Sequence, residues 1–298
     1  VHRSSMAEQA WAGHPFWRPL RRLFRGKPLQ TWQPEPGERP LMWRRALLLV
    51  LVALGAIIGT DYMIDIMPQH GRDWAERGLL TLFAILFAWV SAGFWTAVLG
   101  AWVMLRRGDR HSITNVLRGE AAAAPIAADS RTAIIMPICN EDVATVFAGL
   151  RATCESLAGT GSAERFDFFV LSDTNDPDAR AAEQIAWTRL TDALREAGTP
   201  VQVYYRWRQH RTHRKAGNVA DFCRRFGADY RYMIVLDADS VMSGDCLVAL
   251  VRMMEAHPDA GIIQTAPRAA GHDTTHARIL QFCSRVYGPL FTAGLHYW

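Results

Sequence analysis

The sequence predicts an α/β domain with a mostly parallel sheet flanked by helices, preceded by two transmembrane helices. Two long apolar segments lie within the first 105 residues, and beyond Arg131 short strand-like runs alternate with helical patterns. Only 21% of the 298 residues are charged, compared with about a quarter in an average soluble chain. Alternation of strands and helices is typical of parallel βαβ units with right-handed crossovers.

Residues 1–45 are expected to form a basic cytoplasmic tail, because they are rich in Pro, Arg and Trp and show no periodicity. The segment carries nine basic and three acidic residues, whereas the whole chain has a net charge of only +4. That net charge is too small to indicate a nucleic-acid-binding protein. The tail could contact anionic lipid headgroups or an acidic protein, through Arg18, Arg21, Arg22, Arg25 and Lys27.

Residues 46–105 predict two transmembrane helices joined by a short periplasmic loop. Ala46–Thr60 and Leu79–Leu105 contain no charged residue, and a helix needs about 20 apolar residues to cross the bilayer. Basic residues flank the pair, so the positive-inside rule places both ends in the cytoplasm; they are Arg44, Arg45, Arg106, Arg107 and Arg110. Gly55 and Gly59 have the spacing of a helix-packing face, or they are chance glycines that face lipid.

Residues 106–130 are expected to be a linker, and residues 131–298 an α/β domain that is incomplete at its C-terminal end. Apolar or β-branched runs predict strands at Thr132–Met136, Phe166–Leu171, Val201–Tyr205 and Tyr232–Leu236, with a weaker fifth at Gly261–Gln264. Between them, helical patterns occur at Asp142–Leu157, Ala179–Ala197, Gly217–Phe226 and Asp245–His257.

Candidate binding residues, most of them polar or charged, follow each of the first four predicted strands. They are Pro137, Asn140 and Glu141 after the first, Asp173 after the second, Lys215, Gly217 and Asn218 after the third, and Asp237 and Asp239 after the fourth. In an open parallel sheet, ligands bind beyond the carboxyl ends of the strands. Each group alone is more often a helix cap, a solvated turn or an ordinary basic loop. Four such groups at one edge favour a binding site.

Asp237 and Asp239 are the sharpest of these signals. Residues i and i+2 of an extended chain point to the same side, and two neighbouring carboxylates stay ionised only when a positive group joins them. Mg²⁺ or Mn²⁺ is typically held by one or two carboxylates together with substrate phosphates. Asp176-Pro-Asp178 has the same spacing, but there it predicts an N-cap, a proline at the first helical position and an acid in the first turn.

Other templates are missing or incomplete. The pairs His210/His213 and His272/His276 lack a third metal ligand at a suitable spacing, and the sequence contains neither a dinucleotide-binding glycine motif nor a P-loop. Five cysteines without a Cys-x-x-Cys pair argue against a disulfide framework or a structural zinc site.

Taken in chain order, the motifs resemble those of the family 2 glycosyltransferases, which have the GT-A fold. They are Pro137-Ile-Cys-Asn140-Glu141, Ser172-Asp-Thr174, His213-Arg-Lys-Ala-Gly-Asn218 and Asp237-Ala-Asp239, and the resemblance covers Arg131–Trp298. It implies a uridine pocket lined by Pro137, Asn140 and Glu141, with Asp173 on the uracil or ribose side. It also implies that Lys215, Gly217 and Asn218 lie against the nucleotide and diphosphate, and that Asp237 and Asp239 hold the metal.

The resemblance, together with the two apolar segments, implies a multi-pass enzyme of the bacterial inner membrane with its catalytic domain in the cytoplasm. Such an enzyme would be an inverting glucosyltransferase that uses UDP-glucose to extend a growing periplasmic β-glucan, with a divalent metal to stabilise the departing UDP. An acyl carrier protein is an implied partner. Alternatives are a processive transferase similar to cellulose or hyaluronan synthase, a membrane-tethered UDP-sugar-binding module without turnover, and a scaffold whose acids are helix caps.

Two parts of the family pattern are not found before Trp298: the general base and the Gln-x-x-Arg-Trp motif of the acceptor side. Asp245, Asp259 and Asp273 are interpreted as helix-start or turn residues. Gln202 to Trp207 has one residue too many for the acceptor motif and precedes the acid pair, so we interpret it as strand and loop. We therefore expect a fragment with the donor half of the site, inactive alone, with the general base beyond Trp298.

Overall fold

The computed structural model describes residues 41–68, 70, 72–106, 109, 112–118, 125–269, 271 and 273–298. These residues form two compact units. An α/β unit comprises Val116–Ile263, and a helical unit comprises the described residues up to Asn115 together with Gln264–Trp298. Most of the predicted basic tail, including Arg18 to Lys27, lies outside the described residues, as do Arg107, Arg110 and much of the predicted linker.

Four parallel strands form the sheet of the α/β unit, in the order β3-β2-β1-β4. The strands are β1 (Thr132–Ile138), β2 (Phe166–Ser172), β3 (Gln202–Trp207) and β4 (Tyr232–Val235). This confirms the four stronger strand predictions. Every residue of β1 and β2 is buried, because helices cover both faces of a parallel sheet and leave no polar face on its central strands.

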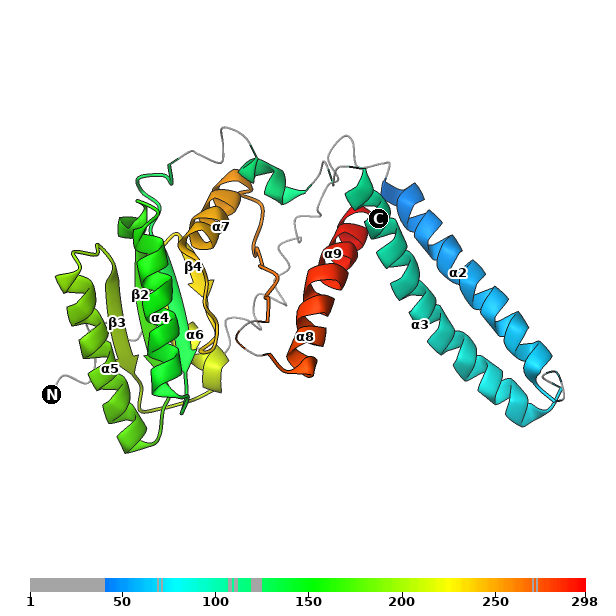
Figure 1. Ribbon diagram of the computed structural model, residues 1–298, viewed down its shortest axis with the longest axis horizontal. Coiled ribbons are helices and arrows are strands. Elements are labelled where there is room, and N and C mark those ends of the chain that lie inside the picture. Colours follow the sequence, from blue (N-terminus) through cyan, green and yellow to red (C-terminus); the bar gives the residue numbers. More distant parts are fainter. Residues whose placement is uncertain are drawn as a thin grey trace, which may run out of the picture. The chain divides into compact units, whose positions relative to one another are not determined.

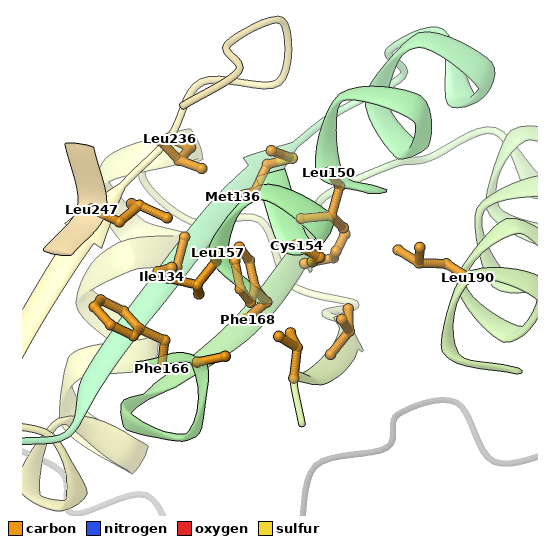
Figure 2. Packing of buried hydrophobic residues seen from close by; sticks show 14 of the residues in the cluster. Ile134, Met136, Leu150, Cys154, Leu157, Phe166, Phe168, Leu190, Leu236 and Leu247 are labelled. Carbon is orange, nitrogen blue, oxygen red and sulfur yellow. The ribbon is translucent and has the colours of Figure 1, made fainter. Parts of the chain in front are cut away.

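Helices lie on both faces of this sheet (Figure 1). They are α4 (Val143–Ala158), α5 (Pro177–Glu196), α6 (Arg214–Phe226) and α7 (Gly244–Ala256). Side chains of α4, α5 and α7 pack with alternate residues of the strands in the larger core, which Figure 2 shows around Ile134, Leu150 and Phe168. The opposite residues, including Ile135 and Phe169, pack against Phe222 of α6. Successive side chains of each strand point to opposite faces of the sheet, so α4, α5 and α7 pack on one face and α6 packs on the other.

The weaker fifth strand, predicted at Gly261–Gln264, is wrong. These residues have no strand conformation, and the side chain of Ile262 is 89% exposed. A short apolar run becomes a strand only when a neighbouring strand pairs with its backbone and its side chains find a buried face. This run obtains neither, so its β-branched residues do not decide its conformation.

Short 3₁₀ helices complete the connections, at Ile113–Leu117, Ala163–Arg165 and Gly227–Asp229. In the helical unit, α2 (Leu41–Ile66) and α3 (Trp74–Leu105) form a hairpin (Figure 1). Both are long and apolar enough to cross a membrane, over Trp43–Ile66 and Trp74–Leu105. Many of their large apolar side chains are exposed, as Leu82 and Trp89 illustrate, whereas a core helix of a soluble protein would bury them. The two predicted apolar helices are therefore confirmed as candidate membrane spans.

The Gly55 and Gly59 pair forms a packing face between α2 and α3. A Cβ atom added at Gly55 would lie 2.4 Å from the Ser91 hydroxyl oxygen, and one at Gly59 would lie 2.4 Å from the Phe87 ring. Small residues at this spacing let two membrane helices approach closely. Of the two interpretations left open by the sequence, the structure supports the packing face.

Three further segments follow the α/β unit and belong with the helical unit: α8 (Thr275–Phe282), a π-helical turn at Cys283–Tyr287, and α9 (Gly288–Tyr297). Helix α9 packs closely on α3, since a Cβ atom at Gly100 would lie 1.9 Å from the Leu290 carbonyl oxygen and one at Gly294 would lie 2.2 Å from that of Thr96. By compactness the α/β unit is Val116–Ile263, and the domain bounds of residues 131–298 stay a prediction.

Candidate functional site

The carboxyl ends of all four strands surround one cavity of about 780 Å³ in the α/β unit. It is lined by Pro137, Ile138, Cys139, Glu141, Asp173, Arg211, Arg214, Lys215, Asp237, Ala238 and Asp239. Six of the nine predicted site residues are in this lining: Pro137, Glu141, Asp173, Lys215, Asp237 and Asp239. The parallel sheet therefore brings the strand ends to one edge, as the sequence predicts.

Asn140 is one of the three predicted residues that the cavity lining does not include. Its backbone has a φ of +57°, a left-handed conformation that asparagine tolerates better than most residues. Its side-chain amide donates to the Asn175 Oδ1 atom at 2.6 Å, and its backbone N–H donates to the Thr174 hydroxyl oxygen at 3.0 Å. The Asn175 backbone N–H donates in return to the Asn140 Oδ1 atom at 3.2 Å. Asn140 thus joins the loops that follow β1 and β2.

Asn218 and Gly217 are the other two, and both hold the start of α6 in place. Asn218 is 1% exposed; its amide donates to the Leu171 carbonyl at 2.9 Å, and its Oδ1 atom accepts from Arg206 at 2.6 Å. At Gly217 an added Cβ atom would lie 1.9 Å from the Thr212 carbonyl oxygen. Only glycine allows the preceding loop to pass this close to the helix.

Asp237 and Asp239 are exposed and face the cavity, and the Lys215 ammonium group forms an ion pair with Asp237. Among the described residues, no three His, Cys, Asp or Glu side chains gather into a preformed metal site. A pair of carboxylates open to the cavity nevertheless suits Mg²⁺ or Mn²⁺, which complete their coordination with water and substrate phosphates. The lysine shows that this position already attracts a positive charge.

Asp173 reaches the cavity as half of an ion pair that the sequence analysis missed. Arg208 Nε contacts Asp173 Oδ1 at 2.5 Å, and Arg208 Nη2 contacts Asp173 Oδ2 at 2.8 Å. The register pairs Ser172 of β2 with Trp207 of β3, so the next residue on each strand is Asp173 and Arg208, side by side. An acid and an arginine in equivalent positions after adjacent strands were the available signal, but it requires the register.

Behind Asp173, the buried side chain of Glu183 on α5 holds the neighbouring residues. Its carboxylate accepts hydrogen bonds from the hydroxyls of Ser172 at 2.7 Å, Thr174 at 2.5 Å and Tyr205 at 2.8 Å. Burial raises the pKa of the Tyr205 hydroxyl, which further favours the protonated form that donates this hydrogen bond. Glu183 therefore fixes the residues on both sides of Asp173.

Two sequence patterns that imitate functional motifs are structural. Asp176 caps α5, with its Oδ1 atom accepting from the Asp178 backbone N–H at 3.0 Å, and Pro177 begins the helix. Gln202–Trp207 is strand β3. Both interpretations made from the sequence are confirmed.

A cavity that combines paired carboxylates with lysine and arginine side chains at the carboxyl ends of parallel strands is suited to a phosphate-bearing nucleotide. The chain belongs to the family 2 glycosyltransferases: the family model described as Glycosyl transferase family 2 matches residues 133–296. This match covers every residue of the four strands except Thr132 and confirms the family predicted from the motifs. Enzymes of this family commonly use a divalent metal.

Curated relatives make the comparison more specific. The chain is 56% identical over 307 residues to a glucans biosynthesis glucosyltransferase H of Ralstonia nicotianae, covering 99% of this chain and 35% of the relative. It is 53% identical to that of Cupriavidus pinatubonensis, with the same coverage, and 51% identical to that of Pseudomonas paraeruginosa, covering 100% of this chain and 37% of the relative. The chain thus spans about a third of the length of these relatives, and the similarity includes its apolar helices.

Proposed function

We propose that this chain carries the donor-binding part of a membrane-bound inverting glucosyltransferase that uses UDP-glucose to extend a periplasmic β-glucan. The observation that carries the proposal is the cavity in which Asp173, Lys215, Asp237 and Asp239 converge from three different strand ends. The relatives are named for glucan biosynthesis, which supports this function over a synthase of cellulose or hyaluronan. Transfer to the growing glucan acceptor would use residues elsewhere in a longer protein, the general base among them.

In this proposal different lining residues of the cavity bind different parts of the donor. Pro137, Glu141 and Asp173 would contact uracil and ribose, at the ends of β1 and β2. The cations of Arg211, Arg214 and Lys215, which also line the cavity, would attract the diphosphate. Asn140, Gly217 and Asn218 would act from behind, by holding the loops and the start of α6.

Asp237 and Asp239 would hold Mg²⁺ or Mn²⁺ against the diphosphate. When bound, the metal supplies Lewis-acid stabilisation of the negative charge that develops on the departing UDP. Lys215 would leave Asp237 as the cation arrives and turn its ammonium group toward the phosphate oxygens. Asp173, with its carboxylate neutralised by Arg208, would not repel the diphosphate.

We further propose that α2 and α3 cross the bacterial inner membrane with the α/β unit on the cytoplasmic side. Arg44 and Arg45 lie near the start of α2, and Arg106 follows the end of α3, so the basic residues gather at the ends where positive-inside topology expects them. Binding of the basic tail to lipid or to an acyl carrier protein stays a prediction.

Isothermal titration of the 298-residue chain in detergent, with UDP and Mn²⁺, tests the donor site. The wild-type chain is expected to bind UDP more tightly with Mn²⁺ than with EDTA. Asp239→Asn should lose most of this metal-dependent gain, since one of the two carboxylates is gone. The matched control is Asp178→Asn, which alters the other Asp-x-Asp sequence at the start of α5. Equal UDP affinity with and without metal, or an Asp239→Asn variant equal to wild type, would refute the metal site.

A further inference from the structure

Arg208 connects two segments that line the cavity, although it is not itself among the lining residues. One edge of its guanidinium binds both carboxylate oxygens of Asp173, at 2.5 and 2.8 Å. Its Nη2 atom also donates to the backbone carbonyls of Thr212 at 3.3 Å and Arg214 at 2.8 Å. A single side chain therefore joins the loop after β2 to the basic segment that leads into Lys215.

The basic segment needs such support because its backbone is strained. His213 has a φ of +59° and Arg214 a φ of +47°, a left-handed conformation that costs a residue other than glycine on the order of 1 kcal/mol or more. Two consecutive residues in this conformation persist only where neighbouring contacts fix them. The two carbonyls bound by Arg208 belong to Thr212 and Arg214, so the contacts bracket the strained turn.

The pairing is buried and has the geometry of a bidentate contact. The side chains of Arg208 and Asp173 are 11% and 6% exposed, so water competes little for either group. Arginine presents several N–H donors in a rigid planar fork, whereas lysine offers one flexible ammonium group. Only arginine can bind both oxygens of Asp173 and reach the two carbonyls together.

We propose that Arg208 is a positioning residue that sets the spacing between Asp173 and the cations of the basic segment. This positioning role rests on the proposed function, because the spacing would match the distance between the base and the diphosphate of one bound nucleotide. Without Arg208 the strained turn at His213 and Arg214 would relax, and Lys215 would move away from Asp237. Asp173 would also be left as a bare negative charge beside the diphosphate.

The test is the affinity for UDP, measured in Mn²⁺ with the 298-residue chain in detergent. Arg208→Ala and Asp173→Asn should each weaken binding about tenfold, and the double variant should be little weaker than either, because the two residues act through one contact. Arg208→Lys should recover only a small part of the loss. Arg180→Ala is the matched control, since Arg180 stacks on Trp207 at 4.4 Å and does not line the cavity.

Two readouts separate positioning from general stability. Millimolar ethylguanidinium should restore UDP affinity to Arg208→Ala by occupying the vacated space. Mn²⁺ affinity measured without UDP should not fall, because Arg208 does not bind the acid pair, and it should rise by at most the about two- to fivefold expected when Lys215 leaves Asp237.

A wild-type chain that does not bind UDP would refute the proposed function itself. A wild-type chain that binds UDP, beside an Arg208→Ala variant of equal affinity, would refute the positioning role alone. The positioning role is also refuted if the loss is accompanied by a large fall in the unfolding temperature and is not reversed by ethylguanidinium.

Discussion

Lys215 forms an ion pair with Asp237, one of the two acids that we propose bind the metal, and the two side chains are 54% and 63% exposed. The cation must therefore displace an ammonium group. Lys215→Met should tighten Mn²⁺ binding in the absence of nucleotide by about two- to fivefold, the equivalent of an exposed ion pair. The same variant should weaken UDP binding in Mn²⁺, because a phosphate-binding cation is lost. Titration calorimetry measures both affinities.

The opposite signs of these two effects are the diagnostic result. Arg211→Met is the control, because it removes a positive charge from the same cavity and leaves the Lys215–Asp237 pair in place. It should weaken UDP binding with a smaller change in Mn²⁺ affinity. If Lys215→Met weakens both, the ammonium group does not compete with the metal.

At this scale, the sequence was informative where a residue's function depends on its place after a strand. Asp237 and Asp239 come just after β4, so strand prediction alone placed them at the cavity, although β4 itself is only half-buried. Asn218 was predicted beside the ligand, yet its side chain turns inward to the Leu171 carbonyl. Which way a side chain points from the first turn of a helix depends on packing, and no local pattern encodes it.

Asp221 of helix α6 forms an ion pair with Arg206 of strand β3 and a second one with Arg225. The Asp221 carboxylate pairs with Arg206 of β3 and contacts Arg225 at 3.0 Å, and its own side chain is 7% exposed. Burial raises the pKa of Asp221, but the hydrogen bond from Arg225 and the charge of Arg206 outweigh it, so this pKa lies below its ordinary value of 3.8. Folding therefore favours the ionised carboxylate.

The stability contributed by Asp221 should be fully present above pH 3.8 and should be lost as the pH falls through the lower pKa of the folded state. Asp221→Asn should reduce the free energy of unfolding at pH 7 by about 3 kcal/mol, because Arg206 is left buried without its charged partner. Urea unfolding at several pH values measures this, and the difference from wild type should narrow below pH 3.8. Asp192→Asn, in an exposed pair with Arg195, should have little effect at any pH, and an equal loss there would contradict the assignment.

Elements were predicted well where periodicity was strong. The four parallel strands and α4 to α7 appear within a few residues of their predicted bounds, because each strand alternates with an amphipathic helix. The strand predicted at Gly261–Gln264 does not form, because an isolated apolar run becomes a strand only when a partner strand is present. The Gly55 and Gly59 pair was ambiguous for a similar reason: its meaning depends on Ser91 and Phe87 of another helix.

The whole molecule combines a helical hairpin with an α/β unit, and its proposed orientation can be tested with a membrane-impermeant maleimide. Cys139 is exposed in the α/β unit, and Arg72 lies in the loop between α2 and α3. In a chain whose other cysteines are replaced, Cys139 should react only in inside-out vesicles. After Arg72→Cys in a variant that lacks Cys139, labelling should occur only in right-side-out vesicles, because the loop is expected to be periplasmic.

The reverse pattern of labelling would show that the hairpin has the opposite orientation. Labelling of both positions from one side would show that the hairpin does not cross the membrane.

Sequence periodicity predicted the order of the hairpin and the α/β unit along the chain. It did not predict that Gln264–Trp298 groups with the hairpin, because the contact between Gly294 and Thr96 joins residues almost two hundred positions apart.

Strand β4 is the shortest of the four, and its length has a consequence for the volume of the site. Its last ladder pair joins Val235 to Ile135, whereas β1 continues to Ile138. The chain thus leaves the sheet early, and Asp237 begins a loop at a level where β1 is still extended. Ile138 at the end of β1 and both carboxylates line the same cavity, so the early end of β4 leaves room for a bulky anion beside them. We expect that a longer fourth strand carrying the same acids would place its own backbone beside the end of β1 and leave less space for the ligand.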